Sequence, residues 1–239
     1  MLYSLFSSIN SLEILKSISS RSCLAAFTAF FISIFFGHWF IKRLRSLKVG
    51  EDTTKTDSEE LKRMHFDKKN TPTMGGIVII VSILVSVLLW CNIYNEYILL
   101  LMFTLIWFGV LGFIDDYIKL TQTKAAGLTD VSKLLFQSAL GLILGLILYF
   151  HMKKFAWGTH VVIPLVKDFR PDLGPLYILF VTFFIVGMSN AVNLTDGLDG
   201  LAIGCGIIAG IAFAVVAYVS GRMDFSDYLR ILYIPGSGE

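Results

Sequence analysis

Charged side chains are scarce in this sequence, and long apolar runs take their place. Only 16% of the 239 residues are Asp, Glu, Lys or Arg, whereas 55% are hydrophobic. A water-soluble domain of this size could not hide so much apolar surface in one core. The composition therefore excludes an ordinary soluble enzyme and indicates a protein embedded in a bilayer.

Other scarcities exclude further classes of protein. The net charge is only +2, and no run of Lys and Arg is interleaved with aromatic residues, so no nucleic acid is expected as a partner. Cys23, Cys91 and Cys205 lie in separate apolar stretches at unrelated spacings, which excludes a disulfide framework and a cysteine metal site. We expect no cleavable signal peptide, because the first apolar block is too long for one and basic residues follow it.

Apolar blocks of about 20 residues can cross a bilayer as helices, and the sequence contains six blocks near this length. They are Cys23–Ile41, Met74–Cys91, Tyr97–Ile114, Leu134–His151, Gly174–Met188 and Leu201–Val219. The last block is rich in glycine, at Gly204, Gly206 and Gly210, which suits close helix packing in lipid. The predicted fold is an all-α integral membrane protein, a polytopic bundle of about six transmembrane helices.

This pattern divides the chain into three parts. Residues 1–22 are weakly amphipathic and are expected to lie on the membrane surface. Residues 23–219 form the transmembrane region, and residues 220–239 form a short C-terminal tail.

The distribution of Lys and Arg predicts the orientation of the chain. The loops 42–73, 115–133 and 189–200 together hold twelve of these residues, and the opposite side holds eight. Because cytoplasmic loops carry the excess of positive charge, we expect these three loops in the cytoplasm and the N-terminus outside. The segment 152–173 is then an external hairpin or loop.

Two adjacent carboxylates, Asp115 and Asp116, follow the third apolar block. Neighbouring carboxylates stay ionised together only with a cation nearby, and Mg²⁺ binds through one or two carboxylates plus substrate phosphates. On a helix, Lys119 would share their face. The alternative is a solvated helix end with an internal ion pair.

Polar residues recur every third position between the fifth and sixth blocks, at Asn190, Asn193, Asp196 and Asp199. A helical turn would present them along one side, and Gly197 beside them allows close backbone approach to a ligand. Such a density of polar groups between apolar spans is costly without partners. The alternative is a capped loop between helices.

Lysines, hydroxyls and a glycine pair precede the second block, in the string from His65 to Gly76. Lys68 and Thr73 at the start of a helix would suit a phosphate group. The alternative is a basic anchor beside the membrane with a helix cap.

A weaker set of polar residues leads into the fourth block. It comprises Gly127, Thr129, Lys133 and Gln137. Lys133 can extend its charged end to the interface, and the polar Gln137 one turn further in hints at a second function.

Three strings in the sequence resemble a known family. They are Thr71-Pro-Thr-Met-Gly-Gly76, Phe113-Ile-Asp-Asp-Tyr117 with Lys119, and Asn190-Ala-Val-Asn-Leu-Thr-Asp-Gly-Leu-Asp-Gly-Leu-Ala202. They closely resemble the phospho-N-acetylmuramoyl-pentapeptide transferases, within the polyprenyl-phosphate N-acetylhexosamine-1-phosphate transferase superfamily. The resemblance implies a multi-pass enzyme of the bacterial inner membrane with a cytoplasmic active site. It also implies a Mg²⁺-dependent reaction, in which undecaprenyl phosphate attacks the β-phosphate of UDP-N-acetylmuramoyl-pentapeptide, giving lipid I and UMP in the first membrane step of peptidoglycan synthesis.

The resemblance also implies roles for individual residues. Asp115, Asp116 and Asp196 would be the catalytic and metal-binding carboxylates, with Asp115 deprotonating or orienting the lipid phosphate or forming a covalent aspartyl-phosphate. The substrate-binding residues fall into three groups: Asp199 with Gly197 and Leu198 at uracil; Lys68, Thr73, Asn190 and Asn193 lining the site; and Lys119 and Lys133 offsetting the diphosphate charge.

The sequence departs from the family at two places. Asn70 stands where the family usually has glycine, and residues 50–64 do not follow the usual pattern. The family also has further spans after the sixth, with another Asp motif and a His-rich loop, so we expect an incomplete transferase. Its partner would be a separately supplied C-terminal half or a second copy in a homodimer.

Two other functions remain open from the sequence. One is a non-catalytic membrane scaffold derived from such an enzyme. The other is a membrane transporter, which would place ionisable residues near the middle of its spans, whereas the acids here lie at span ends.

Overall fold

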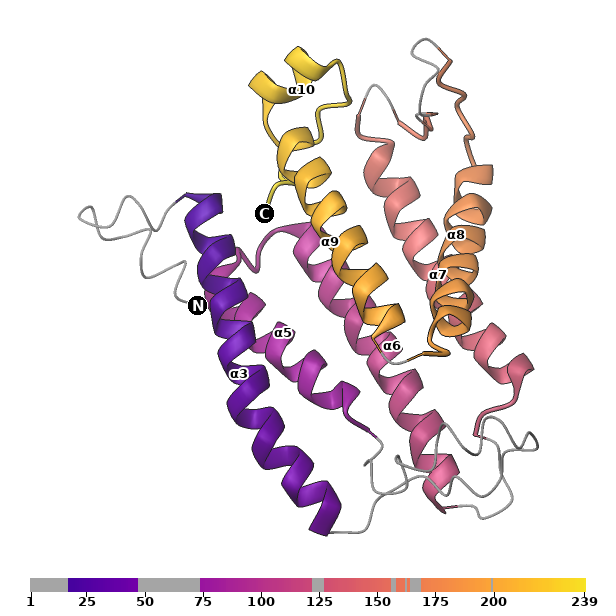
Figure 1. The fold of residues 1–239 in the computed structure, drawn as a ribbon. Helices are drawn as coiled ribbons and strands as arrows, with labels where there is room; N and C mark the ends of the chain where they lie inside the picture. Colours follow the sequence, from indigo (N-terminus) through magenta and orange to yellow (C-terminus); the bar gives the residue numbers. More distant parts are fainter. Residues whose placement is uncertain are drawn as a thin grey trace. The chain divides into compact units, whose positions relative to one another are not determined.

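The described part of the chain is helical. The computed structural model describes residues 17–46, 74–121, 127–155, 158–161, 163, 169–198 and 200–239. Its helices, in chain order, are α3 (Ile18–Ser46), α5 (Gly76–Trp90), α6 (Glu96–Thr121), α7 (Asp130–Met152), α8 (Leu176–Thr195), α9 (Leu201–Ser220) and α10 (Met223–Leu229) (Figure 1). Each of the six predicted apolar blocks coincides with one of them, so the all-α membrane fold is confirmed.

Five of these helices, α3, α6, α7, α8 and α9, are long and apolar enough to cross a membrane. Large apolar side chains on them are widely exposed, for example Phe183 on α8 (78%) and Ile208 on α9 (72%), as expected for surfaces that face lipid. The sixth apolar helix, α5, has 15 residues and covers about 22 Å at 1.5 Å per residue.

Three helices extend well past the C-terminal ends of the predicted apolar blocks. α3 continues to Ser46, α6 to Thr121 and α8 to Thr195. Hydrogen bonding within a helix does not stop where hydropathy falls, because each further turn still satisfies its own backbone groups. Asp115, Asp116 and Asn190 therefore lie on helices and not in loops.

The chain forms two compact units, residues 1–128 with 214–239, and residues 129–213. In the first unit α3 packs against α5. A Cβ on Gly37 would lie 3.3 Å from the Val78 side chain, and the Trp90 indole N–H donates to the Thr28 hydroxyl at 2.9 Å. The close approach at Gly37 and the hydrogen bond between Trp90 and Thr28 hold α3 and α5 together at two positions along their length.

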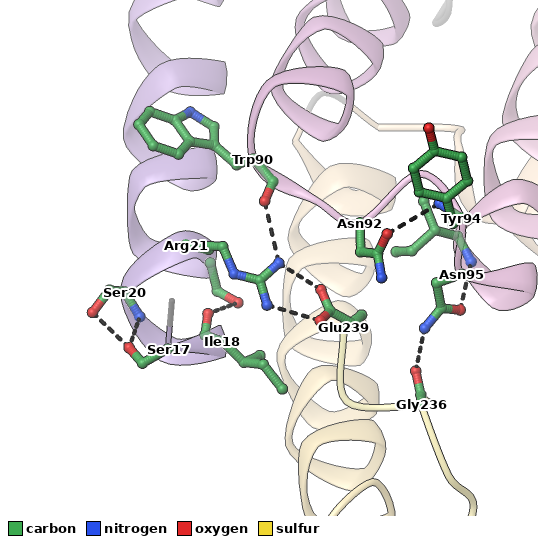
Figure 2. Close-up of polar contacts among 12 residues, drawn as sticks. Ser17, Ile18, Ser20, Arg21, Trp90, Asn92, Tyr94, Asn95, Gly236 and Glu239 are labelled. Carbon is green, nitrogen blue, oxygen red and sulfur yellow. Dashed lines mark hydrogen bonds and ion pairs between the residues drawn. The ribbon is translucent and has the colours of Figure 1, made fainter. Parts of the chain in front are cut away.

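An ion pair between a buried arginine and a half-buried glutamate lies at the start of α3 (Figure 2). The Arg21 guanidinium donates to both carboxylate oxygens of Glu239, at 2.7 and 2.8 Å, and also to the Trp90 carbonyl at 3.3 Å. Nearby, the Asn95 amide donates to the Gly236 carbonyl at 2.7 Å. These contacts join the start of α3, the end of α5 and the segment that follows α10.

In the second unit α7 and α8 run side by side, and two glycines set their close approach (Figure 1). A Cβ on Gly141 would lie 2.8 Å from the Thr182 Cα, and one on Gly145 would lie 2.9 Å from the Ile178 carbonyl oxygen. Gly141 and Gly145 form the small-xxx-small spacing that lets helix backbones pack closely in lipid. Leu140 and Leu144 beside them are buried.

The close packing that the sequence suggested for residues 201–219 is found instead in α7. A Cβ at Gly204, Gly206 or Gly210 would meet no described atom of its own unit within 4 Å. Glycines leave a helix surface without side chains, so that another helix can approach closely. The glycine content does not show which helix does so.

The connection between α7 and α8 contains the kind of contact that a hairpin makes, whereas its external location stays a prediction. His160 and Asp172 form an antiparallel bridge, with Val161 donating to the Pro171 carbonyl at 3.0 Å and Leu173 to the Thr159 carbonyl at 3.2 Å. The Asp172 carboxylate accepts from the Thr159 hydroxyl and from the Gly174 backbone N–H.

Candidate active site

The Asp115 carboxylate lies near the C-terminal end of α6, where both of its oxygens have partners. Oδ2 pairs with the Lys119 ammonium at 2.9 Å, and Oδ1 accepts from the Leu128 backbone N–H at 2.7 Å. The Asp115 side chain is 14% exposed and the Lys119 side chain 41%. Lys119 shares the face of Asp115 as predicted, and the internal ion pair of the alternative interpretation is present. Its two partners fix the orientation of the Asp115 carboxylate.

Gly127 allows the backbone to approach this carboxylate. Its φ of +94° lies in the region that favours glycine. A Cβ there would come within 2.5 Å of Asp115 Oδ1 and 2.8 Å of the Lys119 Cε. A side chain here would have to displace the Asp115 carboxylate and the Lys119 side chain, so glycine favours the contact between the Leu128 N–H and Asp115.

Asp115 and Asp116 place two carboxylates close to the C-terminal end of α6. The last turns of a helix carry partial negative charge on their free carbonyls, and the two carboxylates add to it. Lys119 offsets part of the charge of Asp115. Carboxylates are hard oxygen ligands of the kind that a divalent cation such as Mg²⁺ prefers.

The second polar set lies at the end of α8. Asn190 and Asn193 are on the helix, and Asp196 is its C-cap with an exposed side chain. Gly197 and Leu198 follow in an exposed turn. The helical spacing predicted for the first members of the set is present, whereas Asp199 lies outside the described residues.

Gln137 on α7 makes direct contact with this second set. Its amide is buried, donates to the Ser189 hydroxyl at 3.0 Å and accepts from the Asn190 amide at 2.9 Å. Lys133 lies one turn earlier, in the first turn of α7, where Thr129 caps the helix by accepting from the Ser132 N–H at 3.2 Å.

The structure brings the predicted residues together in two groups. Asp115 joins Lys119 in the first unit, and Asn190 joins Gln137 in the second. Asp116 belongs to the first unit and Asp196 to the second. Lys68 and Thr73 lie outside the described residues.

Sequence reasoning missed two participants in these groups. The Leu128 backbone N–H has no sequence signature, although the preceding glycine indicates a turn. Ser189 adjoins the recognised string but was not part of it, and its role becomes visible only through Gln137. A glutamine within an apolar run was the available signal for the second group.

Two models of known protein families match this sequence. The family model described as glycosyl transferase family 4 matches residues 97–236, more than half of the chain. The model described as phospho-N-acetylmuramoyl-pentapeptide-transferase signature 1 matches residues 68–80. Together these matches cover all three strings on which the resemblance rested.

Three relatives are similar over essentially the whole chain, and each is named phospho-N-acetylmuramoyl-pentapeptide-transferase. Those from Desulforapulum autotrophicum and Oleidesulfovibrio alaskensis are both 42% identical over 238 residues. The one from Thermodesulfovibrio yellowstonii is 43% identical over 239 residues. All of this chain is covered, and it spans 64%, 64% and 65% of the three relatives' lengths.

Proposed function

We propose a reaction for this chain, which belongs to glycosyl transferase family 4. It transfers phospho-N-acetylmuramoyl-pentapeptide from its UDP-activated form to undecaprenyl phosphate, giving lipid I and UMP. Identity of 42–43% to three relatives with the corresponding name supports the choice of reaction. The observation that carries it is the oriented Asp115 carboxylate near the end of α6, an apolar helix long enough to cross a membrane.

The bonds in this reaction balance without an oxidant or a reductant. An oxygen of the lipid phosphate attacks the β-phosphorus of the nucleotide sugar, and the bond from that phosphorus to the oxygen of the α-phosphate breaks. UMP leaves with that oxygen, and the lipid keeps a diphosphate that joins it to the sugar. We place this chemistry on the cytoplasmic side, as the excess of Lys and Arg in the 42–73, 115–133 and 189–200 loops favours.

Asp115 is the residue that receives the lipid phosphate. Two oriented contacts keep its carboxylate in one position, so it can hold the attacking phosphate and take up its proton without reorganising first. Lys119, partly exposed beside it, offsets the charge of the diphosphate.

The carboxylates of Asp115, Asp116 and Asp196 are the ligands that we propose for Mg²⁺, an ion that prefers hard oxygen ligands and takes a small number of carboxylates together with substrate phosphates. Among the described residues, no group of three or more His, Cys, Asp or Glu side chains is arranged to hold a metal ion, and Asp196 belongs to a different unit from the two other acids. When bound, Mg²⁺ neutralises charge on the transferring diphosphate and its leaving group. The adjacent acids Asp115 and Asp116 then keep their charge with less mutual repulsion.

The polar end of α8 is proposed to bind the nucleotide. Asn190 and Asn193 lie on consecutive turns of the helix, and Gly197 and Leu198 form the exposed turn after its C-cap. We assign this turn with Asp199 to uracil. Lys133, Lys68 and Thr73 complete the proposed substrate contacts.

The test is a transfer assay on the purified chain in detergent. UMP release is measured with Mg²⁺ and both substrates, and then with polyprenyl phosphate left out. Asp115→Asn is expected to lower the rate by at least about 100-fold, the scale of a lost acid–base group. Asp172→Asn, an aspartate in the connection between α7 and α8, is the matched control and should retain the rate. The proposal would be contradicted if UMP were released at the same rate without polyprenyl phosphate, or if Asp115→Asn released UMP at the wild-type rate.

A second arm supplies the remaining part of a relative. The C-terminal third of the Thermodesulfovibrio yellowstonii protein is co-expressed, because this chain spans 65% of that relative. Turnover that depends on it would support the proposed C-terminal half as a partner. Light scattering on the same samples distinguishes that complex from a homodimer. If no turnover is seen either with or without this C-terminal part, the transferase proposal fails and the membrane scaffold is the remaining interpretation.

A further inference from the structure

Gln137 and Asn190 form a hydrogen-bonded chain between α7 and α8. The Asn190 amide nitrogen donates to the Gln137 Oε1 at 2.9 Å and to the Val186 carbonyl at 2.8 Å. The Gln137 amide nitrogen donates in turn to the Ser189 hydroxyl at 3.0 Å. Gln137 is 5% exposed, whereas Asn190 is exposed.

A backbone carbonyl fixes the direction of this chain. The oxygen of Val186 can only accept, so the Asn190 atom that faces it is the amide nitrogen and not the oxygen. The second hydrogen of that nitrogen then points at Gln137, which must present its own oxygen. The Gln137 nitrogen is left to face Ser189, whose hydroxyl can accept.

Both hydrogens of the Asn190 side-chain amide are donated within the protein, one to Gln137 and one to the Val186 carbonyl. Among the described residues none donates to Asn190 Oδ1, so the carbonyl oxygen is the polar atom that Asn190 has left to offer. A carbonyl oxygen repels a phosphate oxygen and attracts the hydrogen of a hydroxyl or N–H group, or a cation.

We propose that Gln137 is a positioning residue that holds Asn190 as a fixed acceptor in the nucleotide site. The group that Asn190 contacts is electropositive: a hydroxyl or N–H hydrogen of the nucleotide sugar, or the divalent cation. The phosphate groups are then bound by the proposed lysines, Lys68, Lys119 and Lys133. The inference deepens the proposed function and rests on it for the identity of the ligand.

The cost of a buried glutamine supports this assignment. An amide in an apolar helix needs hydrogen-bond partners, and Gln137 finds both of its partners on consecutive residues of α8. The close approach of the helices at Gly141, one turn further along α7, brings them within reach. A leucine would fill the same space without that cost, so the glutamine has a use beyond packing.

A spectroscopic experiment tests the hydrogen-bonded chain without reference to catalysis. The full chain is labelled with ¹⁵N-asparagine, and the Asn190 amide is assigned by its loss in Asn190→Asp. We expect slow hydrogen exchange of this amide in the wild-type chain and in Ser189→Ala, which leaves the Gln137 acceptor in place. Gln137→Met, similar in length but without an acceptor, should accelerate the exchange. Exchange in the wild-type chain as fast as in the unfolded chain would overturn the proposal.

A double-mutant cycle tests the effect on substrate. Gln137→Met is expected to raise KM about tenfold, or about 1.4 kcal/mol, with a smaller change in kcat, and Gln137→Glu, which keeps an acceptor, should recover part of the loss. In the Asn190→Ala background, Gln137→Met should have no further effect, because it acts through Asn190. Additive losses would overturn the positioning role, since a general packing defect would persist in that background.

The same kinetics identify the group that Asn190 contacts. A raised KM for the nucleotide sugar indicates a hydroxyl or N–H of the substrate, and a raised Mg²⁺ requirement indicates the cation. If the wild-type chain transfers nothing even when the C-terminal part of its relative is supplied, the proposed function fails, while the exchange measurement still decides the positioning of Asn190.

Discussion

At the scale of single residues, Gly127 controls how closely the backbone approaches Asp115. Gly127→Ala would force a side chain into the left-handed region, at a cost of about 1–2 kcal/mol, and would push the turn away from the carboxylate. We expect a loss of transfer activity of at least about tenfold, measured as UMP release, because 1.4 kcal/mol is a factor of ten. Gly112→Ala on α6 is the control, since its Cβ would meet no described atom within 4 Å. Equal activity of the two variants would contradict this account.

Asp172 gives a prediction about pH. Hydrogen bonds from the Thr159 hydroxyl and then from the Gly174 N–H hold the pKa of this carboxyl below its usual range. Because the folded-state pKa is lowered, the stabilisation is fully present above the ordinary Asp pKa of about 3.9. It is lost as pH falls through the lowered value. Titration of the Asp172 carboxyl ¹³C signal should show a midpoint below the ordinary value in the wild-type chain, and a higher midpoint in Thr159→Val.

Residue-level prediction from sequence succeeded where the partners share a helix. Asp115 and Lys119 are four residues apart, and helical spacing alone puts them together. The contacts of Asp115 with Leu128 and of Gln137 with Asn190 depend on how a turn folds back and how two helices pack. No periodicity within one segment contains that information.

At the scale of helices, Gly141 sets the distance between α7 and α8. Gly141→Leu would place a side chain against the Thr182 backbone, and overpacking of this kind costs about 1–3 kcal/mol. We expect a lower melting temperature in detergent, together with loss of the slow exchange of the Asn190 amide. Gly210→Leu on α9 is the matched control, because its own unit places no described atom within 4 Å. The account would be wrong if Gly210→Leu destabilised the protein more than Gly141→Leu.

The sequence predicted which segments are helical better than where they end or what they pack against. Hydropathy identified each long or apolar helix of the described residues, because crossing a bilayer requires a minimum length of apolar sequence. It placed the ends of α6 and α8 too early, at the last apolar residues, although both helices continue through polar turns. The tail predicted for residues 220–239 contains a further short helix, α10, which has only seven residues and no long apolar signal.

At the scale of the whole molecule, the Arg21–Glu239 pair joins segments that lie 218 positions apart in the sequence (Figure 2). The two side chains are 6% and 15% exposed, so Glu239→Ala would leave the buried guanidinium without its carboxylate partner. Breaking a buried pair in this way costs about 3–5 kcal/mol. We expect a marked fall in the melting temperature in detergent.

The matched control removes both charges. Arg21→Met combined with Glu239→Met should recover much of the lost stability, since neither ion is then left without its partner. If Glu239→Ala melted at the wild-type temperature, the pair would contribute nothing to the first unit. Sequence reasoning could not have found this pair, because each residue alone resembles an ordinary charge beside an apolar segment.

The central claim, that the chain transfers a phospho-sugar to a lipid phosphate, is tested most directly by the mass of the lipid product. The chain, with the remaining part of its relative supplied, is incubated with undecaprenyl phosphate, Mg²⁺ and either UDP-N-acetylmuramoyl-pentapeptide or a simpler UDP-N-acetylhexosamine. We expect a lipid whose mass has increased by phospho-N-acetylmuramoyl-pentapeptide, formed from the first donor only and lost with Asp115→Asn. An unmodified lipid, or one carrying the simpler sugar instead, would contradict the claim.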